Sequence, residues 1–543
     1  MIRPLVALAA VLLATAAVAQ AAPRIDPVRI AAHTMALASD EFEGRAPSTP
    51  GETRSTQWIA DQFRAAGLEP AGPNGSYFQE VPLYRFTRKG PAQSSFRIGG
   101  QAMAVTPAED ILINSIRPEP QARVSDVPVV FVGYGVKADE RGWDDFKGMD
   151  LKGKLLVMLV NDPDFEAPAG HPTHRKFDGQ AMTYYGRWTY KFEEAARQGA
   201  AGVLVVHETA GAGYPWTVLK NSDNAPKFDI VRADPASHSA PVQGWIQRSV
   251  AEALFRRAGQ DFSALKEAAK RADFRPVALQ GVTFSTAFDV EAAKITSRNV
   301  MARVTGSKHP DEALIYGAHW DAFGRGVADA SGDDIYNGAI DNATGVAALI
   351  ELGRVFAQGP KPERTVIFVS WTAEESGLIG SQHYALNPVV PLETTVGNLN
   401  VDSLLPGPAP REIVVIGYGK GELDDWLARE AAAKGRVLIP DPAPQAGAFY
   451  RSDHFPLARL GVPVLFPSAG FTGFNAASQD YVKNRYHQPS DEWDPSWTFE
   501  GAAEDVQLMY AVGWKLANSR AWPGWKRGAE FAAERQRSAA RRK

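Results

Sequence analysis

The chain has 543 residues, of which 45% are hydrophobic and 22% are charged, and its formal net charge is −4. This length predicts two or three packed units rather than a single core. The composition excludes a disordered or membrane-embedded chain, and the charge gives no general electrostatic reason to bind nucleic acid. Because cysteine is absent, a metal site would have to be built from His, Asp and Glu.

The N-terminus has the pattern of an export signal. Arg3 precedes an apolar run from Leu5 to Val18, and small residues suited to cleavage follow it as far as Ala21. The run is shorter than the roughly 20 residues that a membrane-spanning helix needs. We therefore predict a signal peptide over residues 1–21, a periplasmic or secreted protein, and no stable membrane insertion after cleavage.

Two helical stretches are expected next, on either side of the turn GRAPSTPG. The second covers about Glu52 to Ala66, with apolar residues on one face and Gly67 at a C-cap position. We assign residues 22–125 to the first part of the larger domain.

From Val127 the chain changes to short β-branched strands punctuated by glycine, with the sequences VPVVFVGYGV, LKGKLLVMLV and AGVLVVHE. These strands predict a separate β-rich lobe, which we place at residues 126–287. Its aromatic segment TYYGRWTYKF is expected to pack this lobe against the larger domain.

Strands and helices alternate from Asn299 to about Asn518, and the strands ALIYGAH and RTVIFVSW are almost entirely apolar. This alternation predicts an α/β fold with a mainly parallel sheet covered by helices on both faces. We assign residues 288–520 to the second part of the larger domain. Residues 521–543, which end in RQRSAARRK, are predicted to form a basic, solvated tail.

Polar residues occur where these strands end, and ligands of open α/β sheets bind at the carboxyl ends of strands. Taken alone, each is a weak signal, and Asp341 has the position of an ordinary helix N-cap. Together they supply carboxylates and imidazoles that suit zinc, and a carboxylate can bridge two ions roughly 3.5–4 Å apart. The candidates are His319, Asp341, Glu374, Glu375, Asp402 and His487.

The spacing of these residues indicates further roles. Asp321 lies two residues after His319, so in an extended backbone it could accept the second imidazole N–H. Glu374 and Glu375 are adjacent and cannot both face a metal in the same way. One can be a ligand while the other acts as general base on a water molecule.

Several motifs in one order carry a resemblance to a known family: HWD, IDNATG, TAEESGLIGSQHYA, NVDSL, RSDHFPLARLGVP and YHQPSDEWD. They resemble the co-catalytic zinc aminopeptidases, a family that includes bacterial leucyl aminopeptidase, glutamate carboxypeptidase and transferrin receptor. The early segments ASDEFEGRAPSTPGE and QFRAAGLEPAG are also similar to that family. Residues 126–287 resemble the protease-associated domain inserted in many members. The resemblance implies the zinc exopeptidase fold.

The resemblance also implies two Zn²⁺ ions. Asp341 would bridge them, His319 and Asp402 would hold one ion, and Glu375 and His487 would hold the other.

Further residues take roles through the same resemblance. Glu374 would be the general base, Asp321 would orient the first metal-binding histidine, and the peptide bond between Asp341 and Asn342 would be cis. Some members have a tyrosine where this chain has Phe449. The neighbouring Tyr450 is therefore the candidate donor to the oxyanion of the tetrahedral intermediate.

The activity implied is removal of N-terminal residues from peptides, with a peptide as the partner. A carboxypeptidase or dipeptidase would need cations for a substrate carboxylate, and Arg325, Arg451 and Arg485 lie near the motifs. A transferase similar to glutaminyl cyclase is a further alternative, against which the inserted lobe argues. A receptor resembling transferrin receptor would show broken metal ligands, but all five are intact. The sequence leaves side-chain preference and oligomeric state open.

Overall fold

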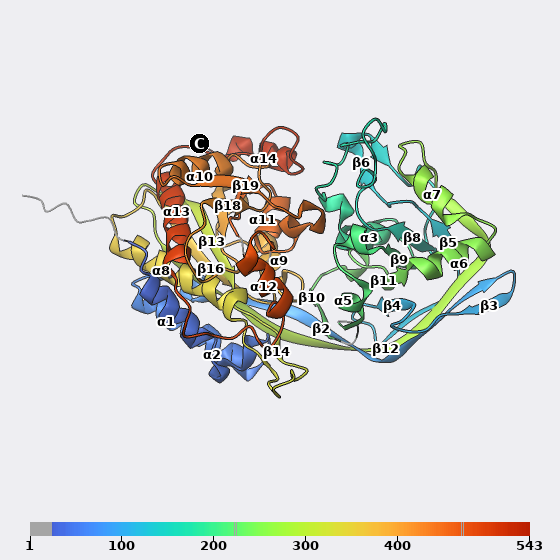
Figure 1. Ribbon diagram of the computed structural model, residues 1–543, viewed down its shortest axis with the longest axis horizontal. Helices are drawn as coiled ribbons and strands as arrows, with labels where there is room; N and C mark the ends of the chain where they lie inside the picture. The colour runs from blue at the N-terminus through green and yellow to red at the C-terminus, as the bar shows by residue number, and fades with distance from the viewer. Residues whose placement is uncertain (1–23, 222, 224, 469, 471, 543) are drawn as a thin grey trace, which may run out of the picture.

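The computed structural model describes residues 24–221, 223, 225–468, 470 and 472–542. The predicted signal peptide at residues 1–21 lies outside this range. Two lobes stand side by side, joined by a long antiparallel ribbon of two strands, β2 (Phe78–Ile98) and β12 (Val277–Val304) (Figure 1). Among the described residues, one 14-stranded sheet runs through both lobes in the order β20-β17-β13-β16-β12-β5-β8-β9-β11-β4. Strands β2, β3, β1 (Glu69–Pro70) and β10 (Lys227–Ile230) lie off this path.

The first lobe contains one of two mainly parallel parts of this sheet, and the second lobe contains the other. The parallel strands of the first lobe are β13 (His309–His319), β16 (Arg364–Trp371), β17 (Thr395–Asn400) and β20 (Val464–Leu465). Strand β13 pairs in parallel with β16 and β17, and β17 pairs in parallel with β20. Strand β12 is antiparallel to β16, so the sheet is mixed. The predicted α/β class is confirmed.

Helices cover both faces of these strands, because alternate strand residues point to opposite sides. Tyr316 packs into the core formed with α1 (Pro27–Leu37), α2 (Pro50–Ala65), α8 (Thr344–Gln358), α10 (Leu423–Ala432) and α13 (Glu500–Ala517). The neighbouring Ile315 packs on the other face, against α9 (Ile379–Leu386) and α11 (His454–Arg459). Burial on both faces explains why these strands are almost continuously apolar.

The predicted early helices are present as α1 and α2. Helix α2 begins after Thr49, whose hydroxyl accepts a hydrogen bond from the Glu52 amide at 3.3 Å. Gly67 follows the helix with φ of +87°, a conformation that glycine adopts without steric cost. Gly67, which the sequence indicates as a C-cap position, therefore marks the end of this helix correctly.

The second lobe has a core of its own. Its strands are β3 (Gln101–Ala104), β4 (Ile111–Asn114), β5 (Gln121–Phe131), β8 (Leu155–Leu159), β9 (Gly202–His207) and β11 (Val242–Gln247), with helices α3 (Trp188–Arg197), α6 (Arg248–Arg257) and α7 (Phe262–Ala269). This core also contains Phe86, Phe96 and Ile111. It therefore begins earlier in the chain than the lobe boundary predicted at residue 126.

The C-terminal segment folds back onto the first lobe. Arg535, in α14 (Ala532–Arg537), is 4% exposed and donates to the carbonyl oxygens of Thr395, Val396 and Pro523 at 2.9, 3.4 and 3.3 Å. Trp525 Nε1 donates to the Gly461 carbonyl at 3.1 Å. The prediction of a solvated tail is therefore wrong for the part of the segment around Trp525 and Arg535, which partners far away in sequence bury, whereas most of residues 536–542 are exposed. Within the described part of the chain, no helix has both the length and the apolarity needed to cross a bilayer.

Candidate metal centre

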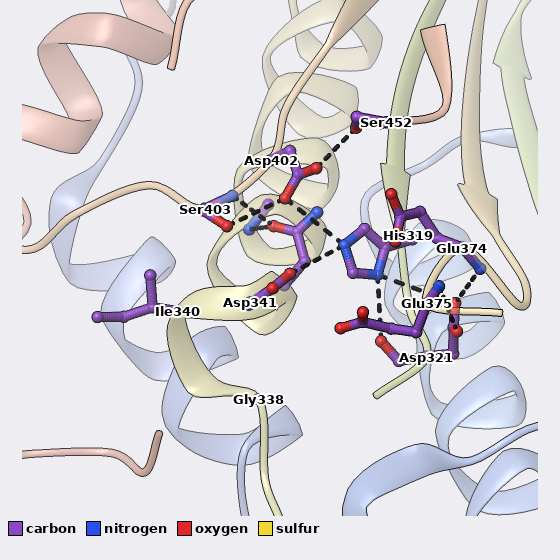
Figure 2. A network of polar contacts seen from close by, with 12 residues as sticks. His319, Asp321, Gly338, Ile340, Asp341, Glu374, Glu375, Asp402, Ser403 and Ser452 are labelled. Atoms are coloured by element: carbon purple, nitrogen blue, oxygen red, sulfur yellow. Dashed lines mark hydrogen bonds and ion pairs between the residues drawn. The ribbon is translucent and has the colours of Figure 1, made fainter. Parts of the chain in front are cut away.

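The parallel strands end together at one edge of the first lobe and place the candidate ligands there. His319 is the last residue of β13, the turn after β16 carries Glu374 and Glu375, and Asp402 follows β17 (Figure 2). Asp341 lies in the irregular turn Ala339–Ala343 that leads into α8. His487 follows α12 (Ala476–Asn484).

These side chains meet in two groups that share Asp341. His319 Nε2 lies 3.0 Å from Asp341 Oδ1 and 3.5 Å from Asp402 Oδ1. His487 Nε2 lies 3.3 Å from Asp341 Oδ2 and 3.3 Å from Glu375 Oε2. Asp341 thus presents one oxygen to each histidine, as a bridging carboxylate does. The structure brings all five predicted ligands together in the predicted pairs.

Glu374 lies beside the same cluster. Its carboxylate groups with His319 and Asp402, with the donor atoms within 4.8 Å of one another. Burial raises the pKa of Glu374 and of Glu375, and nearby carboxylates raise both further. In the described residues, Oε1 of Glu375 is buried and has no hydrogen-bond partner.

The cluster fits a bound cation. Several carboxylates face one another in a buried space, which is costly without a positive charge between them. Imidazole nitrogens and carboxylate oxygens converge, and Glu375, which belongs to this group, has a buried oxygen without a partner among the described residues. This donor set suits zinc.

Asp321 supports the cluster differently from the prediction. Its carboxylate accepts hydrogen bonds from the amides of Glu374 at 3.0 Å and Glu375 at 3.3 Å. Its Oδ1 is 3.8 Å from His319 Nδ1, whereas its backbone carbonyl oxygen is 3.1 Å from that nitrogen (Figure 2). Strand β13 ends at His319, so the extended alternation assumed for Asp321 does not continue. Asp321 therefore holds the glutamate turn with its side chain and faces the histidine with its carbonyl.

The turn around Asp341 has the backbone form that the resemblance implied. The peptide bond between Asp341 and Asn342 is cis. The Asn342 side chain donates to the Val401 carbonyl at 3.0 Å and accepts from the Ser403 amide at 3.1 Å. It thereby ties this turn to the segment that carries Asp402.

Two supporting residues escaped the sequence analysis, although both lie in quoted motifs. Asp491 accepts from the amides of Ile340 at 3.0 Å and Asp341 at 3.1 Å. Ser452 donates to Asp402 Oδ2 at 2.6 Å. Asp491 belongs to YHQPSDEWD and Ser452 to RSDHFPLARLGVP, so a second polar residue within each motif was the available signal.

Arg45 is a third supporting residue, and it is only 1% exposed. Its guanidinium donates to four backbone carbonyl oxygens, those of Leu37, Trp320, Asn337 and Gly338, at 2.8, 2.7, 2.6 and 3.0 Å. Burial lowers the pKa of Arg45 to about 10, although nearby carboxylates, Asp321 first, oppose that change. Arg45 therefore joins the segment after β13 to the segment before Asp341 and keeps a positive charge beside the acidic cluster.

Tyr450 does not take the predicted position at the cluster. Its hydroxyl donates to Glu530 Oε2 at 2.6 Å, and Lys420 Nζ lies 3.3 Å from its oxygen. Its ring packs against Phe455, with ring centroids 5.2 Å apart. Because its hydroxyl is committed to a carboxylate 80 residues later in the chain, the assignment of Tyr450 as oxyanion donor is corrected.

The rim of the cluster is aromatic. The His487 ring lies between Tyr486, stacked at 3.7 Å, and Phe323, whose centroid is 4.7 Å away and which is 41% exposed. Arg451 Nη2 lies 3.4 Å from the Tyr486 hydroxyl. Tyr486 first, and then the carboxylates of the cluster, raise the pKa of Arg451.

The other two candidate arginines have partners elsewhere. Arg325 forms an ion pair with Asp334 at 2.7 Å. Arg485 lies over the ring of Trp497 at 5.3 Å.

Comparison with known proteins agrees with this geometry. Residues 299–511, which include all five candidate ligands, match the model of Peptidase family M28. The chain is 41% identical over 86 residues to a "Probable zinc metalloprotease" of Pyrenophora teres f. teres (strain 0-1), covering 16% of this chain and 18% of that protein. It is 38% identical over 113 residues to "Aminopeptidase NAALADL1" of Mus musculus, covering 20% of this chain and 14% of that protein. The matches thus span less than a fifth of the length of these relatives.

The fold is shared over almost the whole chain with a solved structure, the aminopeptidase from Aneurinibacillus sp. strain AM-1. The TM-score is 0.51 at 19% identity, and the alignment covers 91% of this chain and 95% of that one. The chain therefore shares the fold of that aminopeptidase.

Proposed function

We propose that this chain is a zinc-dependent aminopeptidase that removes N-terminal residues from peptides. The observation that carries the proposal is the position of Asp341, which offers one carboxylate oxygen to each of two histidine-centred groups. Zinc bound there would polarise the scissile carbonyl. It would also lower the pKa of a bound water molecule to about 7, so that hydroxide is available at neutral pH.

The proposed occupancy is two ions per chain. His319 and Asp402 would hold the first, Glu375 and His487 the second, and Asp341 both. The short distances within each group and the shared carboxylate support this division.

Glu374 is proposed as the general base. Its carboxylate lies with His319 and Asp402, while the adjacent Glu375 is paired with His487. A carboxylate so placed can accept the proton of the attacking water and return it to the leaving amine. Asp321 keeps Glu374 in place through the hydrogen bond to its backbone amide.

A second candidate function is a carboxypeptidase or dipeptidase. Arg451 is the one observation that favours it, because its charge interacts with Glu374 and Glu375 and it is exposed at the aromatic rim. A guanidinium can bind a substrate carboxylate with two parallel hydrogen bonds. The carboxylates of the centre, by contrast, favour the free ammonium of a peptide N-terminus.

Export and the identity of the inserted lobe are also part of the proposal. The sequence pattern at residues 1–21 supports secretion or a periplasmic location. The second lobe has a β-rich core of its own, and this supports a protease-associated domain. A peptide is the proposed partner.

The test uses the purified protein with aminoacyl-anilides and with N-blocked dipeptides, each with and without a chelator. We expect turnover of the anilides only, its loss on chelation, and close to two zinc ions per chain by elemental analysis. Turnover confined to the blocked dipeptides would replace the aminopeptidase by the second candidate. An inactive protein that binds zinc would reject both.

A further inference from the structure

Glu530 joins three parts of the molecule at one carboxylate, and its side chain is 5% exposed. Its Oε1 accepts from the backbone amide of Tyr184 in the inserted lobe at 2.7 Å. Its Oε2 accepts from the Tyr450 hydroxyl at 2.6 Å and from Lys420 Nζ at 2.8 Å. Burial works to raise the pKa of Glu530, but Lys420 and these hydrogen bonds hold that pKa below its usual value. The carboxylate is therefore ionised, and both of its oxygens accept hydrogen bonds.

The segment held by Glu530 leads directly to the metal centre. Tyr450 ends the short turn Ala448–Tyr450, and two residues later Ser452 donates to Asp402 Oδ2 at 2.6 Å. The next residue, Asp453, accepts from the Ser381 hydroxyl of α9 at 2.6 Å. Residues 448–453 thus touch a candidate metal ligand at one end and Glu530 at the other.

The inserted lobe meets the first lobe at the same place. The Tyr184 ring lies 5.2 Å from Phe455 and 6.2 Å from Tyr450. Glu193 of α3 forms an ion pair with Arg459 of α11 at 2.8 Å. The contacts of Tyr184, which lies in TYYGRWTYKF, confirm the prediction that this segment packs the two lobes together.

The segment that carries Glu530 is itself firmly attached. Arg535 and Trp525 are both buried and are hydrogen-bonded to backbone carbonyls of the first lobe. A carboxylate on such a support can restrain the groups bonded to it.

We propose that Glu530 is a positioning residue of the metal centre. Through Tyr450 it holds residues 448–453, so that Ser452 remains on Asp402 and Arg451 remains at the rim, and through Tyr184 it secures the inserted lobe beside them. Glu530 lies beyond the matched residues 299–511. The expected change in KM rests on the proposed function. The expected change in the mobility of residues 448–453 does not.

The first variant is Glu530→Gln, which keeps the side-chain volume but removes the charge. We expect KM for an aminoacyl-anilide to rise about tenfold, the usual size of the loss of one charge-assisted hydrogen bond, with kcat within threefold of the unchanged chain. Zinc content should not change. Glu534→Gln is the matched control, because Glu534 lies four residues away and is paired with the exposed Arg537. Both constants of this control should equal those of the unchanged chain.

A double-mutant cycle identifies the route of the effect. If Glu530 acts through the Tyr450 hydroxyl, Tyr450→Phe alone should also raise KM, and combining it with Glu530→Gln should add little. Additive effects would overturn the proposed route.

A second measurement does not depend on activity or metal. The amides of Tyr450 and Arg451 bond to the carbonyls of Gly447 and Ala448, each at 3.0 Å. Hydrogen exchange at these two amides in the metal-free protein should become about tenfold faster in Glu530→Gln and remain unchanged in Glu534→Gln.

The outcomes separate the two proposals. If the unchanged protein hydrolyses no peptide, the proposed function fails, while unchanged exchange in Glu530→Gln would refute the positioning role independently. If the unchanged protein is active and the variant keeps its KM, Glu530 is a structural residue only and the inference is overturned. If Glu530→Gln does not fold, Tyr450→Phe decides: an unchanged KM in that variant also overturns it.

Discussion

Glu374 and Glu375 are neighbours in the chain but have different surroundings. Glu375 pairs with His487 and also groups with His319 and Asp341, whereas Glu374 groups with His319 and Asp402. The Asp321 carboxylate receives both glutamate amides, which fixes the turn and turns the two side chains to different sides of the cluster (Figure 2). A hydrogen-bonded turn thus separates the proposed ligand, Glu375, from the proposed base, Glu374.

Replacing Glu374 should separate catalysis from metal binding. In Glu374→Gln we expect kcat to fall on the order of 10³-fold, because a general base contributes roughly 10²–10⁴. Zinc content should remain close to two ions per chain. Steady-state kinetics and elemental analysis measure the two quantities, with Glu119→Gln on the exposed surface of the inserted lobe as control. A variant that keeps its rate would remove Glu374 as the base.

Asp491 should control metal affinity without being a ligand. Its two carboxylate oxygens accept hydrogen bonds from the backbone amides of Ile340 and Asp341. In Asp491→Asn one oxygen is replaced by an NH₂ group, which cannot accept, so one of these amides would lose its acceptor. Loss of such outer contacts typically costs 10–100-fold in metal affinity. Competition with a zinc chelator measures this, and Asp494→Asn, in the same loop, should bind zinc normally. Equal affinities of the two variants would contradict the assigned role.

Loops rather than regular elements form the centre, and Arg45 connects two of them. In Arg45→Lys a single ammonium would replace the planar guanidinium, which donates to Leu37, Trp320, Asn337 and Gly338. We expect at least a tenfold loss of zinc affinity and a lower Tm. Arg29→Lys, at a half-exposed position of α1, is the control for both readouts. Zinc affinity equal to that of the control would show that the loops hold together without Arg45.

The start of α10 should make stability depend on pH. Burial raises the pKa of Asp424 to about 6, even though the Gly419 amide donates to it. The folded chain therefore keeps this proton where the unfolded chain, with a pKa near 4, has lost it. Stability should fall as the pH rises from about 4 to about 6 and then level off, by about 1–3 kcal/mol.

Urea unfolding of the metal-free protein at pH 4.5 and 7.5 measures this slope. Asp424→Asn should reduce the difference between the two pH values, whereas Asp425→Asn, the exposed neighbour, should not. A variant at position 424 with the same pH dependence would show that another group carries the effect.

The two lobes have separate cores, and in the described part of the chain the candidate metal centre lies in the first lobe. Zinc binds the folded first lobe and therefore stabilises it by mass action, about 2.7 kcal/mol when free zinc is 100 times the dissociation constant. We expect chelation to lower the unfolding temperature of the first lobe by several degrees. The unfolding of the core around Phe86 and Phe96 should shift much less.

Scanning calorimetry with and without chelator measures this difference. Magnesium added in place of zinc should not restore the transition, because magnesium prefers oxygen ligands and octahedral geometry. Equal shifts of both lobes would mean that they unfold as one unit.

Much of the site was predictable because its chemistry is local in sequence. An apolar strand followed at once by His319 or Asp402 places that residue at the edge of the sheet, and the strand ends meet there because the strands are parallel. The order of the motifs led to the family resemblance, and the match over residues 299–511 agrees with it. The α/β class follows from the same alternation of apolar strands and helices.

The errors occurred where the deciding partner is distant in sequence. Asp321 was placed by assuming that a strand continues past His319, and only the end of β13 redirects its carboxylate to the glutamate turn. Tyr450 was judged by its distance from a motif, whereas Glu530, 80 residues away, takes its hydroxyl.

What the sequence by itself determined is the fold class and the set of candidate metal ligands, because periodicity and residue chemistry act over a few residues. Only the tertiary structure decided which oxygen faces which histidine, which groups hold the loops, and that part of the basic C-terminal segment packs against the first lobe. Each of these depends on contacts between segments far apart in the chain, and such contacts leave no local pattern in the sequence.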